Sequence, residues 1–90
     1  MKVTIWKYPL EITDEQTIEM PVDGYPLFVD LQFDKPCIWV KVPARIATIK
    51  EQKIIIKGTG HDFDDGALQY VGSFMQAEGR LVWHVFWDNK

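Results

Sequence analysis

The chain has 90 residues, of which 47% are hydrophobic and 26% are charged. This length allows one domain, residues 1–90, and the composition is typical of a globular domain rather than a disordered or fibrous chain. Thirteen acidic residues outnumber ten lysines and arginines, giving a formal net charge of −3. Proteins that bind duplex DNA usually carry a basic face, so we expect no duplex DNA partner; a local basic pocket for a small phosphate ligand is still allowed.

The sequence carries no sign of an oxidising or membrane environment. The single cysteine, Cys37, cannot form an internal disulfide. Thr4 and Lys7 interrupt the apolar stretch that a signal peptide would need, and no apolar run approaches a membrane span. We therefore expect a cytosolic protein with no membrane partner.

Short strand-like runs, separated by turn signals, follow one another along the chain. Residues 2–8 form the first run, which ends at Pro9 because proline cannot donate a ladder hydrogen bond. Residues 16–20 form a second run, and residues 21–24 form a turn. Residues 26–33 alternate most clearly, and the alternation predicts that one set faces the core. That set is Leu27, Val29, Leu31 and Phe33, with Phe28, Asp30 and Gln32 on the other face.

The second half of the chain continues this pattern. After a predicted turn at residues 34–36, residues 37–42 return with Ile38, Val40 and Val42 on one face and Trp39 on the other. Residues 43–45 break the pattern, and residues 46–49 are either a short strand or an irregular edge. The β-branched residues 54–56 favour a strand, residues 58–66 form a glycine-rich loop, and residues 68–75 and 81–87 form a last hairpin.

The run 81–87 is apolar on both faces, which is typical of a central strand or of one that faces a partner. No stretch of ten residues has a convincing helical period. The predicted fold class is therefore all-β, a small antiparallel β-sandwich or barrel-like domain of about seven short strands.

The loop at residues 58–66 is the first candidate site. Gly58 and Gly60 let the backbone approach a ligand and present N–H groups to an anion, with Thr59 between them. The alternative is a plain connection between strands. The carboxylates that follow His61 lack the spacing of a known cation loop, so we expect a solvated acidic loop and no metal.

Catalytic constellations are absent from the sequence. His84 lies among aromatic residues, where it either contacts a ligand or is a core residue satisfied by a backbone carbonyl. Cys37 has no activating neighbour in sequence, and no Ser-His-Asp or paired-carboxylate motif is visible. We expect no enzyme activity and no cofactor; a small hydrolase using His61 or His84 is the remaining enzymatic possibility.

Twelve aromatic residues are many for one small core. Trp6 and Tyr8 share a strand face, and Trp39 lies opposite the apolar face of its own strand. Such rings stack on bases, fill a subunit interface or complete the core. Their number favours a homo-oligomer.

The chain resembles a family of small proteins of unknown function that is widespread in phage and prophage genomes. The resemblance runs nearly end to end, and the segment at residues 43–52 departs from it. It is carried by Ile5-Trp6-Lys7-Tyr8-Pro9-Leu10, Gln16-x-Ile18, Met20-Pro21, Gln32, Ile38-Trp39, Gly58-Thr59-Gly60-His61, Tyr70-x-Gly72-Ser73-Phe74 and Leu81-Val82-Trp83-His84-Val85-Phe86.

A phage family of this size and style in turn resembles the viral nucleotide sponges, including anti-CBASS proteins. This resemblance implies a homo-oligomer that binds a cyclic dinucleotide at subunit interfaces and sequesters it without catalysis, in the cytoplasm of the infected bacterial host. The alternative function is a protein-binding or virion-accessory module of a phage with no small-molecule ligand. The expected ligand-binding residues are Trp6, Lys7, Tyr8, Gln32, Trp39, Gly58, Thr59, Gly60, His61 and His84.

Overall fold

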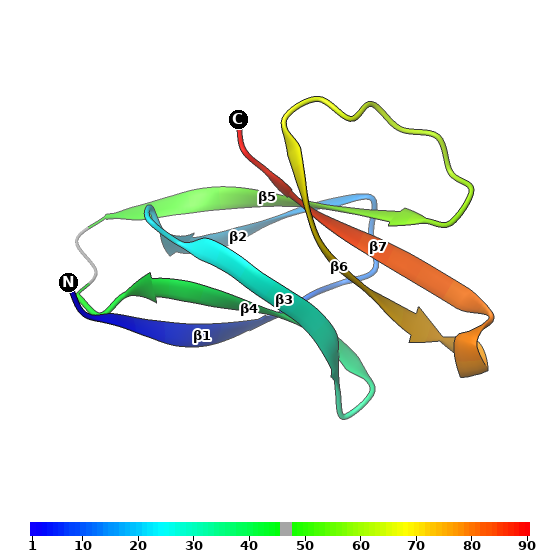
Figure 1. The fold of residues 1–90 in the computed structure, drawn as a ribbon, viewed down its shortest axis with the longest axis horizontal. Helices are drawn as coiled ribbons and strands as arrows, with labels where there is room; N and C mark the ends of the chain where they lie inside the picture. The colour runs from blue at the N-terminus through cyan, green and yellow to red at the C-terminus, as the bar shows by residue number, and fades with distance from the viewer. Residues whose placement is uncertain (46–47) are drawn as a thin grey trace.

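The computed structural model describes residues 1–45 and 48–90, and in these residues seven strands form two stacked antiparallel sheets (Figure 1). The all-β prediction is therefore confirmed, as a small sandwich. The strands are β1 (Val3–Pro9), β2 (Glu15–Pro21), β3 (Tyr25–Gln32), β4 (Lys35–Pro43), β5 (Ile49–Gly58), β6 (Leu68–Gln76) and β7 (Leu81–Asp88), with the 3-10 turn η1 (Ala77–Gly79) between the last two.

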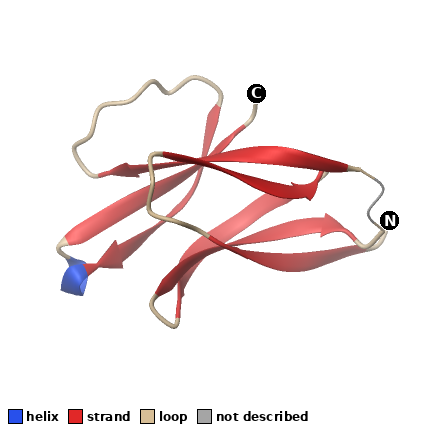
Figure 2. Cartoon of the chain, turned by 180° about the vertical axis from the view of Figure 1, so that it is seen from behind, coloured by secondary structure: helices blue, strands red, loops and turns tan. Residues whose placement is uncertain are grey.

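One sheet has three strands in the order β1-β4-β3, and the other has four in the order β2-β5-β7-β6. The two predicted hairpins, β3-β4 and β6-β7, are confirmed. β7 pairs with β5 on one side and β6 on the other, so it is a central strand, the first of the two alternatives that its doubly apolar sequence allowed. Seen from behind, the two sheets cross, and β3 and β6 lie against each other where they meet (Figure 2).

The core lies between the sheets and is built mainly from β-branched side chains. The predicted inward face of β4 is confirmed, because Ile38, Val40 and Val42 are at most 1% exposed. The four-stranded sheet contributes Ile54, Ile56, Val85 and Trp87 to the same core. Leu10, Met20, Val29 and Phe74 complete the buried cluster.

The predicted inward face of β3 is partly wrong. The register of β3 against β4 shifts between Pro26 and Phe28, so Pro26 takes an inward position and Leu27 is 38% exposed. Such a bulge places an extra residue in one strand, so the residues before it and after it alternate out of step with each other. Val29 still lies inward, whereas Phe33 is 92% exposed.

Phe33 is exposed because it lies in the hairpin turn rather than in the strand. The turn consists of Phe33 and Asp34, with φ of 50° and 65°, and Gln32 pairs with Lys35 directly after it. A two-residue turn with positive φ at both positions matches the twist of a hairpin. The predicted turn at residues 34–36 is therefore displaced, since Lys35 and Pro36 already belong to β4. Of the predicted strand at residues 46–49, residues 46 and 47 lie outside the described residues, and Ile49 begins β5.

Candidate functional site

The outward side of the three-stranded sheet gathers aromatic, apolar and basic residues. Residues directly opposite each other in an antiparallel ladder share a face. Trp39 in the middle strand is opposite Lys7 on one side and Phe28 on the other, and Lys41 is opposite Ile5 and Tyr25. We call this surface the aromatic face, and it comprises Val3, Ile5, Lys7, Tyr25, Phe28, Asp30, Gln32, Lys35, Trp39 and Lys41.

Two rings stack at the centre of the aromatic face. The ring centroids of Phe28 and Trp39 are 4.7 Å apart, and the ring planes differ by 3°. Phe28 is 46% exposed, although such a ring usually lies inside a protein of this size. The Lys41 ammonium lies 5.5 Å from the Tyr25 ring centroid, within the range of a cation–π contact.

The charge of the aromatic face is opposite in sign to that of the chain. Three lysines, Lys7, Lys35 and Lys41, share this face with one carboxylate, Asp30. Lys7 reaches across β4 and donates a hydrogen bond to the side-chain carbonyl of Gln32. The whole chain has a formal charge of −3, so the positive charge is a local feature of this face.

The glycine-rich loop begins at the end of β5 and brings two of the predicted residues together. Thr59 Oγ1 lies 2.7 Å from His84 Nε2, on the outward side of the four-stranded sheet. His84 is half-buried there rather than a core residue, and its contact among the described residues is with the Thr59 hydroxyl. Gly60 has a φ of +91°, and no atom stands within 4 Å of the position that a Cβ would occupy.

His61 turns to the other side of the same strand end. Its backbone N–H donates to the Gly58 carbonyl at 3.1 Å. A Cβ on Gly58 would lie 3.1 Å from His61 Cε1 and 3.3 Å from the Trp83 ring, so a larger residue would push one of these rings aside by a few tenths of an ångström. The loop therefore presents Thr59 outward and His61 towards Trp83, at two different surfaces.

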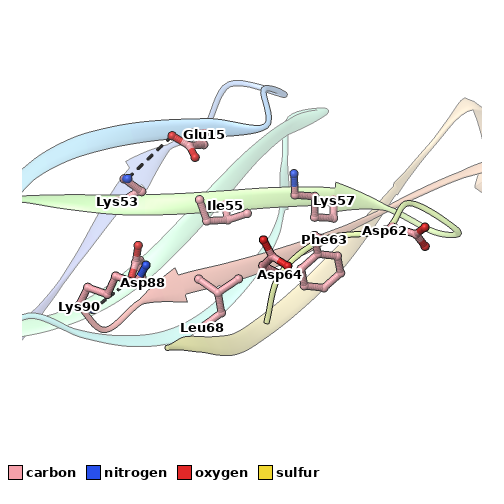
Figure 3. A pocket seen from close by; sticks show the side chains of 10 residues that line it. All are labelled: Glu15, Lys53, Ile55, Lys57, Asp62, Phe63, Asp64, Leu68, Asp88 and Lys90. Carbon is pink, nitrogen blue, oxygen red and sulfur yellow. Dashed lines mark hydrogen bonds and ion pairs between the residues drawn. The ribbon is translucent and has the colours of Figure 1, made fainter. Parts of the chain in front are cut away.

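The middle of the loop covers part of the outward side of the four-stranded sheet, where four carboxylates and three lysines line a groove. Asp62, Phe63 and Asp64 fold back over Ile55 and line this groove of about 380 Å³ (Figure 3). The Phe63 ring lies 5.1 Å from that of Phe86, which holds the loop against the sheet. Of the three lysines in this groove, Lys53 is paired with Glu15 at 3.9 Å and Lys57 with Asp14 at 3.5 Å; the third is Lys90. In the part of the chain that the structure describes, no three His, Cys, Asp or Glu residues are placed to hold a metal ion.

Trp6 and Tyr8 lie on the inward side of β1, opposite Val40 and Ile38. Because β1 is an edge strand, Trp6 is still 41% exposed, whereas Tyr8 packs against the core. The Tyr8 hydroxyl is buried and has no hydrogen-bond partner among the described residues. Burial raises the pKa of Tyr8.

The ten predicted site residues thus occupy three places in one chain. Lys7, Gln32 and Trp39 lie on the aromatic face, while Trp6 and Tyr8 lie on the inward side of the edge strand β1. The third group consists of Gly58, Thr59, Gly60, His61 and His84, at the end of β5 and on the outward side of the other sheet. The two outward sides face away from each other, so one chain does not join the first and third groups in one pocket.

Comparison with protein families matches residues 1–90 to the model described as "Domain of unknown function (DUF7352)". The chain belongs to the DUF7352 family. No curated protein and no solved structure gave a significant match to this DUF7352 domain. In its described residues, no helix is long and apolar enough to cross a membrane.

Sequence reasoning missed several residues that this DUF7352 domain places on the aromatic face. Phe28, Tyr25 and Lys41 were not predicted, because they join Trp39 only through the pairing of β3 with β4. The predicted alternation of residues 26–33 already put Phe28 on the non-core side. That signal would have found the Phe28–Trp39 stack if the hairpin register had been known.

Proposed function

We propose that this DUF7352 protein binds a nucleotide on its aromatic face and does not transform it. The observation that carries the proposal is the stacked Phe28–Trp39 pair among lysines, on a positive face of an acidic protein. The specific role we propose is phage immune evasion. In it, a homo-oligomer in the cytoplasm of an infected bacterium sequesters a host cyclic dinucleotide signal.

A base and a phosphate make different demands, and the aromatic face meets both. Every base has a flat π-surface, so exposed rings bind bases with little sequence preference, at about 1–3 kcal/mol per base. Phe28 and Tyr25 are 46% and 52% exposed and offer such surfaces. Lys7 and Lys41 lie in the rows of the ladder that contain these rings, where their ammonium groups can pair with phosphate oxygens.

Charge favours the aromatic face over the glycine-rich loop as the place for an anion. Asp62 and Asp64 belong to the loop itself, and Lys57 at its start is already paired with Asp14. A phosphate at Thr59 would lie on the same side of the sandwich as these carboxylates. The same groups are on the far side of the molecule from Trp39 and do not oppose a ligand there.

The proposal of binding without catalysis is supported by the composition of the aromatic face. Its residues include no histidine, and Cys37 beneath it is only 4% exposed. The hydroxyl–imidazole contact of Thr59 and His84 lies on the opposite side of the sandwich. A nucleotide on the aromatic face would therefore meet donors and rings, and we expect it to be released unchanged.

A second candidate function is a protein-binding module, which the exposed apolar end of β1 favours. Val3 and Ile5 are 51% and 57% exposed on the same face. Exposed apolar side chains grouped on one face are a feature of contacts with other proteins. This candidate predicts no affinity for nucleotides.

Calorimetric titration with a panel of cyclic dinucleotides, linear dinucleotides and mononucleotides tests the proposal. We expect Phe28→Ala to weaken binding about 5- to 150-fold, which is the stacking energy converted at about 1.4 kcal/mol per tenfold. Tyr70→Ala is the matched control, since Tyr70 is 55% exposed on the other sheet. Mass spectrometry after denaturation should recover the ligand intact.

Three results would contradict the proposal. The first is the absence of binding to any nucleotide, which would favour the protein-binding module. The second is an equal loss of affinity in Phe28→Ala and Tyr70→Ala. The third is recovery of a hydrolysed ligand, which would indicate an enzyme.

A further inference from the structure

One side of the edge strand β1 presents backbone N–H and C=O groups that no strand of the described residues pairs with. Two backbone hydrogen bonds fix which residues of β1 face β4: Ala44 N–H donates to the Lys2 carbonyl at 3.0 Å, and Leu10 N–H donates to the Pro36 carbonyl at 2.9 Å. Residues alternate along an antiparallel ladder, so the even-numbered residues bond to β4. The backbone groups of Val3, Ile5 and Lys7 therefore point away from the sheet. No strand of the described residues pairs with that side (Figure 1).

The neighbouring edge strand, β2, shows how such an edge is normally protected. Ile56 N–H donates to the Asp14 carbonyl and Val22 N–H donates to the Thr48 carbonyl, so the odd-numbered residues of β2 point outward. Those residues include Glu15, Glu19 and Pro21. Charges and prolines on an edge discourage pairing with another chain. The β1 edge instead carries Val3 and Ile5, with Lys7 as its single charge before Pro9.

We propose that two copies of the chain pair through β1, antiparallel, with Ile5 opposite Ile5 of the second copy on a twofold axis. In this register Val3 lies opposite Lys7 of the second copy. Every outward N–H and C=O of these three residues then meets a partner. Pro9 has no N–H, and this limits the pairing to the same segment.

Charge and burial agree with this register. The two Lys7 side chains lie four residues apart along the strands, about 13 Å at roughly 3.3 Å per residue. That separation exceeds the Debye length of about 8 Å at physiological salt, so their repulsion is largely screened. On the inward side, Trp6 would lie opposite Thr4 of the second copy, which covers part of a ring that is 41% exposed in one chain.

The pairing would join the two three-stranded sheets into one continuous sheet with both aromatic faces on the same side. This pairing gives a structure to the homo-oligomer of the proposed function and rests on that function only in this respect. Its test contains no ligand. A monomeric result would remove this interface, whereas the nucleotide titration judges the proposed function separately.

Analytical ultracentrifugation of the chain and three variants tests the interface. We expect a mass twice the 10.5 kDa of the chain for the wild type. Ile5→Pro removes an outward N–H and no bond to β4, so it should give a folded monomer; Ile5→Lys, which sets two charges against each other on the axis, should do the same. Thr17→Pro is the matched control, because it removes an outward N–H from β2 and should leave the dimer intact.

Hydrogen exchange followed by NMR keeps the test decisive if a proline variant fails to fold. In the wild-type dimer the amides of Val3, Ile5 and Lys7 should be protected, and in Ile5→Lys they should exchange rapidly. The proposal is overturned by a monomeric wild type, by a dimer that survives Ile5→Lys, or by rapid exchange of these three amides in the dimer.

Discussion

Gly72 sets how closely β6 approaches β3, and its replacement gives the sharpest test of the packing between the two sheets. Gly72 lies opposite Val85 and faces inward. A Cβ added to it would stand 2.9 Å from Val29 Cγ2, closer than van der Waals contact allows. Overpacking of this kind costs about 1–3 kcal/mol. The lower backbone entropy of alanine in the unfolded chain offsets about 0.4–1 kcal/mol of it.

We therefore expect Gly72→Ala to lower the free energy of unfolding by about 1.3 kcal/mol, the difference between the midpoints of those two estimates. In a domain of this size each kcal/mol corresponds to about 4–8 °C in Tm. Urea denaturation followed by circular dichroism measures the change. Ser73→Ala, at the exposed next position of the same strand, is the control and should be nearly neutral.

A double-mutant cycle with Val29→Ala identifies the cause. Val29→Ala alone should cost about 1.5–2.5 kcal/mol, from two buried carbons at about 0.8 kcal/mol each and a small cavity. The double variant should be more stable than the sum of the single effects predicts, because the alanine at position 72 fills the space that Val29 leaves. Strict additivity, or a Gly72→Ala variant as stable as the wild type, would refute this explanation.

Three further predictions concern the turn, the buried tyrosine and the loop. Phe33→Asn should raise the free energy of unfolding by about 1 kcal/mol, measured in urea, because Phe33 is 92% exposed yet held at a positive φ that costs a non-glycine residue about 1–2 kcal/mol. Tyr8→Phe should stabilise the domain by about 1 kcal/mol by removing an unpartnered buried hydroxyl. Burial raises the pKa of Tyr8 in the fold above its unfolded value. The unfolded chain therefore loses this proton more readily, and the free energy of unfolding is unaffected below about pH 10 and decreases as the pH rises through the folded pKa. Denaturation at neutral and alkaline pH should show a smaller alkaline loss of stability in Tyr8→Phe. Gly60→Val should leave nucleotide affinity unchanged if the ligand lies on the aromatic face, whereas loss of binding with the β-type circular dichroism retained would place the loop in the site, as the sequence alone predicted.

The sequence predicted the strands of this domain well where a single face is strongly apolar. Ile38, Val40 and Val42 alternate in sequence and are buried together, because one side of β4 faces the core along its whole length. The doubly apolar sequence of β7 likewise agrees with its position in the sheet, where it pairs with a strand on each side. Burial patterns of this kind are local and can be derived from periodicity alone.

The sequence failed where a single residue changes the register. The bulge near Leu27 reversed the expected face of that residue. Pro26 beside it is the only signal, and a proline there equally fits the start of an edge strand. The conformation of Phe33 was missed because a phenylalanine at positive φ contradicts its propensity. Such positions are decided by the pairing of β3 with β4 rather than by the residues themselves.

The candidate site depended on pairings that local patterns do not contain. Thr59 and His84 were both predicted, and their contact follows from the pairing of β5 with β7. Trp6 and Trp39 were expected to act together, yet they lie on opposite sides of the three-stranded sheet. Alternation gives the two faces of a strand but does not say which face meets the core when both carry aromatic residues.

The most direct test of the proposed function is NMR mapping of a cyclic dinucleotide titration on the isotopically labelled protein. We predict that the indole Nε1–H signal of Trp39 and the backbone amides of Phe28 and Lys41 shift and saturate together, while the amides of Thr59 and His84 stay in place. Shifts confined to residues 58–61 and His84 would contradict the placement of the ligand on the aromatic face. A spectrum unchanged by every cyclic nucleotide would contradict nucleotide binding itself.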